Sequence, residues 1–155
     1  MTDPKLKENA PDTTHGGRGQ GQGTHSSDTT TRGIRIEVTS NYLPERSAPR
    51  ESQYLFAYHV RVSNVGTETA QLVSRERIIT TAEGDVERVK GPGVVGEQPV
   101  LKPGQAFEYT SGTPLSTSSG IMDGSYQMET EDGKRFDIRI PAFSLDSPHY
   151  RRQLH

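Results

Sequence analysis

A glycine-rich run at residues 91–96, Gly-Pro-Gly-Val-Val-Gly, is the segment of this sequence whose residue types and spacing point most directly to chemistry. It fits the pattern G-x-G-x-x-G, in which glycines let the backbone approach a pyrophosphate held at the N-terminus of the next helix. Here Pro99 and Pro103 follow the run, and proline prevents a normal helix there. No strand–helix–strand pattern surrounds the run either. The sequence therefore argues against a Rossmann-type dinucleotide site.

The same run can hold an anion without a helix, because backbone N–H groups in a glycine-rich loop form a concave nest for phosphate oxygens. This interpretation predicts a nucleotide or pyrophosphate site. Its candidate residues are Gly91, Gly93, Gly96, Lys90 and Lys102. The alternative is structural: the glycines shape a tight loop between sheets, and Val94 and Val95 fill the end of the fold.

Other residue types that support catalysis or metal binding are scattered. The chain has no cysteine, which excludes disulfides, thiolate zinc sites, iron–sulfur clusters and a cysteine nucleophile. No Gly-x-Ser-x-Gly elbow is present. The histidines show no ligand spacing, and they are His15, His25, His59, His149 and His155. We therefore expect no enzymatic activity, no metal site and no cofactor.

Residues 1–32 differ in composition from the rest of the chain. They are rich in Gly, Thr, Ser and Gln, and their apolar members are Met1, Leu6 and Ala10. Such a segment buries too little apolar surface to offset its ordering entropy, so we expect a disordered tail. The tail lacks the apolar run of a secretory signal, and we expect no membrane span and a cytoplasmic location. A single folded domain is expected over residues 33–155.

The charge balance limits the kinds of partner. The 18 Lys+Arg and 20 Asp+Glu residues give a formal net charge of −2. A nucleic-acid-binding protein normally carries a basic excess, so we expect no nucleic-acid partner. The tail has equal numbers of acidic and basic residues and offers no polybasic arm for a membrane surface.

Within residues 33–155 the hydrophobic period is two, which is typical of half-buried β-strands. The alternating faces begin at Ile34, Tyr54, Ala70, Phe107, Tyr126 and Phe136. Asp132-Gly133, between the last two faces, is a strong hairpin signal. No stretch shows a convincing amphipathic helix. The pattern predicts an all-β, two-sheet sandwich, with a small barrel as the alternative.

Two segments near the C-terminal end have expected roles in this architecture. Tyr126 is a candidate corner residue with a bonded hydroxyl, as sandwiches often have. Pro141 marks an edge or the end of pairing, and Phe143 and Leu145 either cap the core or leave an apolar patch for a partner.

Several segments together resemble the ApaG family, in its order and spacing. They are Phe56-Ala57-Tyr58, Ile79-Thr80, residues 91–99 with Pro103-Gly104, residues 109–112, 120–128 and 140–143, and the ending Leu154-His155. The resemblance covers residues 33–155. It implies an immunoglobulin or fibronectin-III-like β-sandwich of about seven to eight antiparallel strands, and no established catalytic activity.

The family resemblance also carries functional associations. The bacterial family is associated with magnesium and cobalt efflux, and its gene often neighbours that of a diadenosine-tetraphosphate hydrolase. Related eukaryotic domains look like protein-interaction modules. A pyrophosphate-binding proposal exists for the family's glycine run, and it carries over to Gly91, Gly93 and Gly96.

One strand departs from the family pattern. The family usually has an aromatic residue, often Trp, where this chain has Arg77, and Thr81 stands where an acidic residue or Asn is common. Arg75 and Arg77 share one face at strand spacing. They form a candidate interaction face that either pairs with acidic neighbours or receives an anionic partner.

Three functions follow from these observations. The leading hypothesis is a non-catalytic β-sandwich module that binds another protein through its edges or loops. The second is a nucleotide or polyphosphate sensor that uses the loop Gly91–Gly96. The third is a weak phosphohydrolase that acts on dinucleoside polyphosphates.

Overall fold

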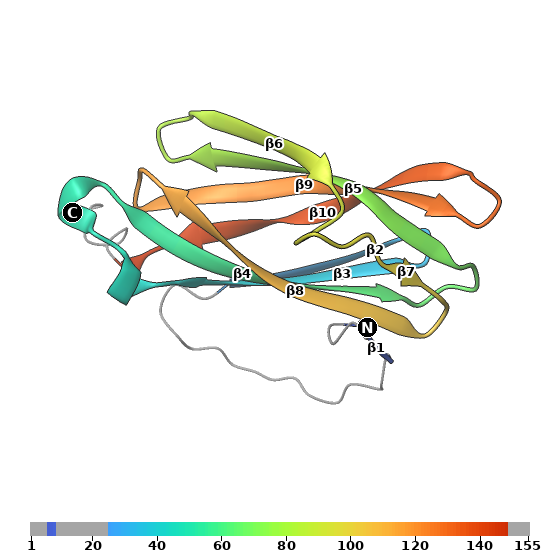
Figure 1. Ribbon diagram of the computed structural model, residues 1–155. Coiled ribbons are helices and arrows are strands. Elements are labelled where there is room, and N and C mark those ends of the chain that lie inside the picture. Colours follow the sequence, from blue (N-terminus) through green and yellow to red (C-terminus); the bar gives the residue numbers. More distant parts are fainter. Residues whose placement is uncertain (1–5, 9–24, 149–155) are drawn as a thin grey trace.

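The computed structural model describes residues 6–8 and 25–148, which form two antiparallel sheets packed face to face (Figure 1). The first sheet has the order β1-β8-β4-β3-β2 and consists of β1 Leu6–Glu8, β8 Gln105–Leu115, β4 Tyr54–Asn64, β3 Ile34–Tyr42 and β2 His25–Thr31. The second has the order β10-β9-β5-β6 and consists of β10 Arg135–Asp146, β9 Ser119–Thr130, β5 Ala70–Thr81 and β6 Val86–Pro92, with β7 Val100–Leu101 paired to β5. The predicted all-β sandwich is confirmed.

Two short helical turns lie between strands of the first sheet. The 3₁₀ turns η1 Pro44–Arg46 and η2 Pro49–Glu51 connect β3 to β4, and each starts with a proline, whose fixed φ suits a first helical position. Across the described residues, no helix is long and apolar enough to cross a membrane.

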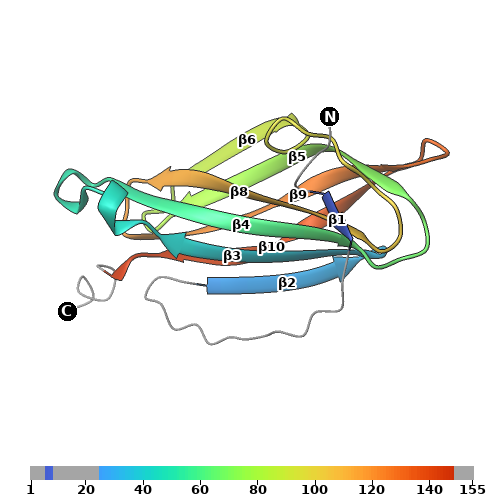
Figure 2. The same cartoon turned by 60° about the horizontal axis from the view of Figure 1, so that its bottom comes forward.

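The core lies between the sheets because each strand alternates apolar and polar residues. Phe56 and Val62 of β4 face Leu72 and Tyr126 of the other sheet, and all four are fully buried. Figure 2 shows the first sheet in front, with β2 along its lower edge. Burial of these faces is the main stabilising contribution, at roughly 25 cal/mol per Å² of apolar surface.

The C-terminal segments cap this core. Phe143 and Leu145 are buried, and the Phe143 ring lies 5.8 Å from the Tyr58 ring, between centroids. This confirms the first of the two expected roles. The β10 strand has a register shift between Ile140 and Phe143, so Pro141 falls at an irregularity rather than in regular pairing.

The Asp132-Gly133 hairpin is also confirmed, and it joins β9 to β10. Gly133 has a φ of +84°, which favours glycine. The Thr130 backbone N–H donates to the Lys134 carbonyl at 2.9 Å. The Thr130 hydroxyl donates to the Asp132 carboxylate, and this bond lowers the pKa of Asp132 below its ordinary value.

The expectation of a disordered tail over residues 1–32 does not hold for His25–Thr31. This segment forms β2 and pairs with β3 from His25–Ser40 to Thr31–Ile34. The pairing relies on backbone hydrogen bonds and on threonine, which suits strands, so it needs no apolar run. The Arg35 guanidinium also donates to the Asp28 carboxylate, with Nη2 at 2.7 Å. The described domain therefore begins before residue 33.

The described residues form ten strands, where about seven to eight were expected. Two of the ten, β1 and β7, are three and two residues long and carry too little pattern to be seen in a sequence. The expectations for His15, His149 and the ending Leu154-His155 fall outside the described residues.

Candidate functional site

A β-bulge in β5 turns Arg75 and Arg77 toward the inside of the sandwich. Leu72 pairs with the buried Met128 of β9, and the register then shifts by one residue at Val73. After the shift, Arg75 pairs with the fully buried Tyr126. Since directly paired residues point to the same face, the odd-numbered residues of β5 now face inward. The structure thus confirms that the two arginines share a face.

The two arginines line a narrow gap between the sheets, which we call the arginine–tyrosine opening. Its lining residues are Tyr58, Val60, Arg75, Glu76, Arg77, Tyr109, Met122, Tyr126, Ile140 and Phe143. Its free volume is about 10 Å³, which is close to the space needed for one water molecule. The opening therefore admits the tip of a polar group and excludes a whole nucleotide.

Arg77 keeps part of its hydrogen-bonding capacity unused. Its Nη1 donates to the Tyr58 hydroxyl at 2.8 Å. Its Nε is buried and has no hydrogen-bond partner among the described residues. Gly124, which pairs with Arg77 on β9, has no side chain on this face. An unpaired buried donor costs stability, so this atom needs a specific explanation.

Arg75 has a different environment, because it braces the glycine-rich loop. Its Nη1 donates to the Gly93 carbonyl at 2.8 Å and to the Pro92 carbonyl at 3.2 Å. Its guanidinium lies against Gly91, where an added Cβ would be 3.2 Å from Nη1. The loop therefore presents carbonyl oxygens to a cation at this point.

Two tyrosine hydroxyls close the inner end of the opening. The Tyr109 and Tyr126 hydroxyls lie 2.5 Å apart, and both residues are buried. Burial raises the pKa of Tyr109 and of Tyr126 well above the ordinary tyrosine value, because the phenolate would lose its hydration. The bonded hydroxyl predicted for Tyr126 is confirmed, and its partner is the Tyr109 hydroxyl.

The glycine-rich loop is a tight turn held by its own backbone. Val95 and Gly96 have φ values of +42° and +82°, which matches a two-residue hairpin turn of the primed type. The Val94 and Glu97 N–H groups donate to each other's carbonyls at 2.8 Å, and the Gly93 N–H donates to Val73 at 2.8 Å. Three amides that a phosphate nest would use are therefore bonded within the chain. Val94 is buried, as the structural alternative predicts, whereas Val95 is exposed.

The two candidate lysines do not join this loop in the described residues. Lys90 pairs with Glu76, so its side chain lies on the face of β6 opposite to Arg75 and Arg77. Lys102 lies in the turn before β8, where its N–H donates to the Gln105 side chain at 3.0 Å. The basic group that contacts the loop is Arg75.

His59 belongs to a charged network on the outer face of the first sheet. Its Nε2 lies 2.9 Å from the Glu108 carboxylate, and its Nδ1 lies 2.9 Å from the Thr110 hydroxyl. Arg61 donates to the other oxygen of Glu108 at 2.9 Å. Within residues 25–148, no three His, Asp or Glu side chains converge as metal ligands would.

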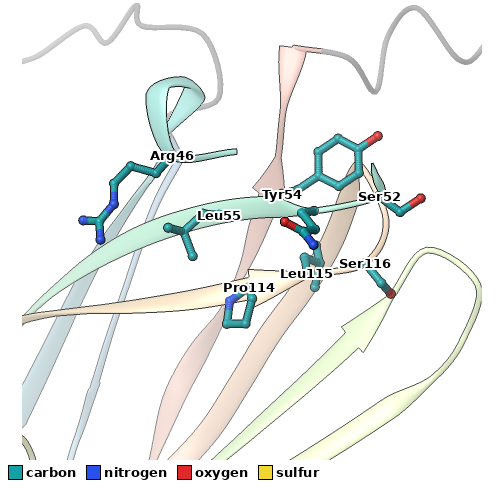
Figure 3. Close-up of a pocket in the computed structure, with 8 residues that line it drawn as sticks. Arg46, Ser52, Tyr54, Leu55, Pro114, Leu115 and Ser116 are labelled. Carbon is teal, nitrogen blue, oxygen red and sulfur yellow. The ribbon is translucent and has the colours of Figure 1, made fainter. Parts of the chain in front are cut away.

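A wider groove lies at the end of the sandwich where β4 and β8 meet the turn after β3 (Figure 3). Its volume is about 440 Å³, and its lining residues are Arg46, Ser52, Gln53, Tyr54, Leu55, Pro114, Leu115 and Ser116. Ser52 has a φ of +56°, which is uncommon for a residue other than glycine. The sequence analysis missed this groove, because its residues are brought together from two distant turns.

Comparisons with known proteins agree with the fold. Residues 44–130 match the family described as ApaG domain. The Protein ApaG of Rhodospirillum centenum is 60% identical over 121 residues, which cover 78% of this chain and 93% of that protein. The Protein ApaG of Paramagnetospirillum magneticum is 59% identical over 125 residues, covering 81% and 96% of the two chains. The crystal structure of a Bordetella pertussis protein provisionally named ApaA has a TM-score of 0.73 at 49% identity and covers 74% of this chain and 94% of that chain.

Proposed function

This chain belongs to the ApaG domain family, and from that premise we propose that it is a non-catalytic protein-interaction module that docks its partner along β6. The observation that carries the proposal is the position of β6 at an edge of the second sheet. Among the described strands, β6 pairs with β5 alone. Its outer backbone edge can accept an extended segment of another protein by strand addition.

The opposite side of the sandwich is closed, which supports β6 as the docking edge. There β10 packs against β3, and the Ser40 hydroxyl donates to the Ser144 carbonyl at 2.8 Å. His25 of β2 lies 3.1 Å from Asp146 of β10. These contacts link the two sheets along that side, whereas β6 lies at the far margin of the second sheet (Figure 1).

A small apolar patch adjoins the same edge. Val86 of β6 and Ile121 of β9 both pair with Thr80 of β5, so the three side chains form one row on the outer face of the sheet. Val86 is 56% exposed and Ile121 is 52% exposed. An exposed apolar row beside an unpaired edge is typical of a docking surface.

Photo-crosslinking in cells tests this proposal. A photoreactive amino acid at position 88, on β6, is expected to give a discrete adduct with another protein. Val86→Glu places a charge on the apolar row and should reduce that adduct at least fivefold. Val65→Glu is the matched control, because Val65 is also 50% exposed but lies in the turn between β4 and β5.

Two outcomes would overturn the proposal. One is the absence of any adduct from position 88. The other is an adduct that the two valine variants reduce equally, since this would show no dependence on β6. We further propose that the module acts in the cytoplasm, and that any part it plays in magnesium and cobalt efflux is exerted through its partner.

A further inference from the structure

The arginine–tyrosine opening carries positive charge without a matching acid. Among the described residues, neither Arg75 nor Arg77 forms an ion pair with a carboxylate. Glu76 lines the same opening, but its carboxylate lies 3.3 Å from Arg88 on the outer face. Both arginines are half-buried, and a partly desolvated cation gains from pairing with an acid, so the opening is electrostatically suited to an anion.

The unused donors of Arg77 have the geometry of a carboxylate receptor. Its Nη1 is bonded to Tyr58, and its unpartnered Nε belongs to the side edge of the guanidinium. This side edge, formed by Nε and Nη2, donates two parallel N–H groups and matches the two oxygens of a carboxylate. A carboxylate there would satisfy the one buried Arg77 donor that lacks a partner.

The position of the opening beside β6 indicates which part of a partner could supply the carboxylate. The free volume of about 10 Å³ holds about one water-sized atom, so only the oxygen end of a side chain can enter. Val89 of β6 pairs with Arg77, so a strand added outside β6 would place a residue in the same row and on the same face. That residue would be two strand spacings from β5, or about 9.6 Å, which an Arg and a Glu side chain together can span.

We propose that the arginine–tyrosine opening recognises an acidic side chain, Asp or Glu, of an extended peptide paired to β6, with Arg77 as the carboxylate receptor. This inference rests on the proposed function and names the chemistry of the partner. Arg75 has a positioning role, because its bonds to Pro92 and Gly93 hold the loop at the end of β6.

The first experiment is a selection of binders from a random dodecapeptide library against the full chain. The expected binders share one Asp or Glu at a fixed position within an alternating, strand-forming pattern. For a selected peptide, replacing that residue by Asn or Gln should weaken the Kd at least tenfold. In nitrogen-15 NMR, the Arg77 Nε–H resonance should shift with the acidic peptide and not with its amide counterpart.

Arg77→Met tests the receptor, and Arg139→Met is its matched control, on the outer face of the same sheet and away from β6. Arg77→Met should remove the preference for the acidic peptide over the amide peptide, whereas Arg139→Met should keep it. Arg77→Lys keeps the charge but loses the two-donor edge, so it should keep only a small part of the preference.

The outcomes separate this inference from the proposed function. Peptides that bind along β6 with equal affinity for the acidic and amide forms would overturn the carboxylate receptor and leave the docking edge standing. Failure to select any peptide, or a shift of Arg77 by sodium acetate but by no peptide, would overturn the inference itself. Equal losses in Arg77→Met and Arg139→Met would also overturn it, since general electrostatic attraction would then explain the preference.

Discussion

At the scale of single residues, Gly93 is the position where the glycine-rich loop tolerates no side chain. Its φ is +56°, and an added Cβ would lie 2.0 Å from the Glu97 carbonyl oxygen. We expect Gly93→Ala to destabilise the fold by about 3 kcal/mol, because the turn must open. Gly96→Ala is the control: its φ is also positive, at +82°, but the space around it is empty, so its cost should be about 1 kcal/mol. Urea unfolding of both variants measures the difference, and equal costs would contradict the role of the clash.

Burial of the Tyr109 and Tyr126 hydroxyls should make the folded state less stable at alkaline pH. Their pKa values are raised in the folded state by burial, whereas in the unfolded chain they return to the ordinary value near 10.0. The unfolded state therefore releases protons first, so the contribution of these two hydroxyls to stability is constant well below pH 10 and falls above it. The expected slope is about 1.4 kcal/mol per pH unit for each tyrosine. Urea midpoints from pH 8 to 11 test this, and in Tyr109→Phe the slope should be shallower.

At the scale of elements, β2 should stabilise the domain, although it lies before residue 33, where the sequence predicts that the domain begins. It pairs with β3 along its whole length and reaches β10 through His25 and Asp146. A chain of residues 33–155 should be less stable than one of residues 25–155 by about 2 kcal/mol, or roughly 8 °C in Tm. Thermal unfolding followed by circular dichroism compares the two. Equal Tm values would mean that the pairing adds nothing.

The loop Gly91–Gly96 is a second element with a testable property. Because Gly93, Val94 and Glu97 use their N–H groups within the chain, we expect pyrophosphate to bind more weakly than about 1 mM. Nitrogen-15 NMR titration with pyrophosphate, with and without Mg²⁺, should show no saturable shifts over residues 90–104. Saturable shifts there would support the nucleotide-sensor hypothesis instead.

The strands that the sequence predicts are those that bury an alternating face. The period of two in residues 54–62 predicts β4 because burial of one face places apolar residues at every second position. β2 and β6 lack this alternation of apolar residues, since β2 pairs through threonine and β6 is mostly exposed at the edge. The same limit applies to the site: the shared face of Arg75 and Arg77 follows from strand spacing, but their contacts with Gly93 and Tyr58 depend on pairing between distant strands.

At the scale of the whole molecule, both sheets contribute to one core, so residues 25–148 should unfold as a single cooperative unit. Far-ultraviolet circular dichroism reports the strands, and near-ultraviolet dichroism reports the packed tyrosines. The two signals should give the same Tm. Separate transitions for the two signals would show that the sheets unfold independently. Because the strands pair over long sequence distances, refolding should take milliseconds to seconds.

The bulge at Val73 has an evolutionary consequence for the interior of the sandwich. Point substitutions change one inward position at a time. Deletion of the single bulged residue would instead straighten β5 while Leu72 stays opposite Met128 and Arg75 stays opposite Tyr126, so that Arg75 and Arg77 would still face inward. One codon lost at this point in the gene would therefore shorten β5 by one residue and leave the charge of the opening and the pairing of every other strand in place.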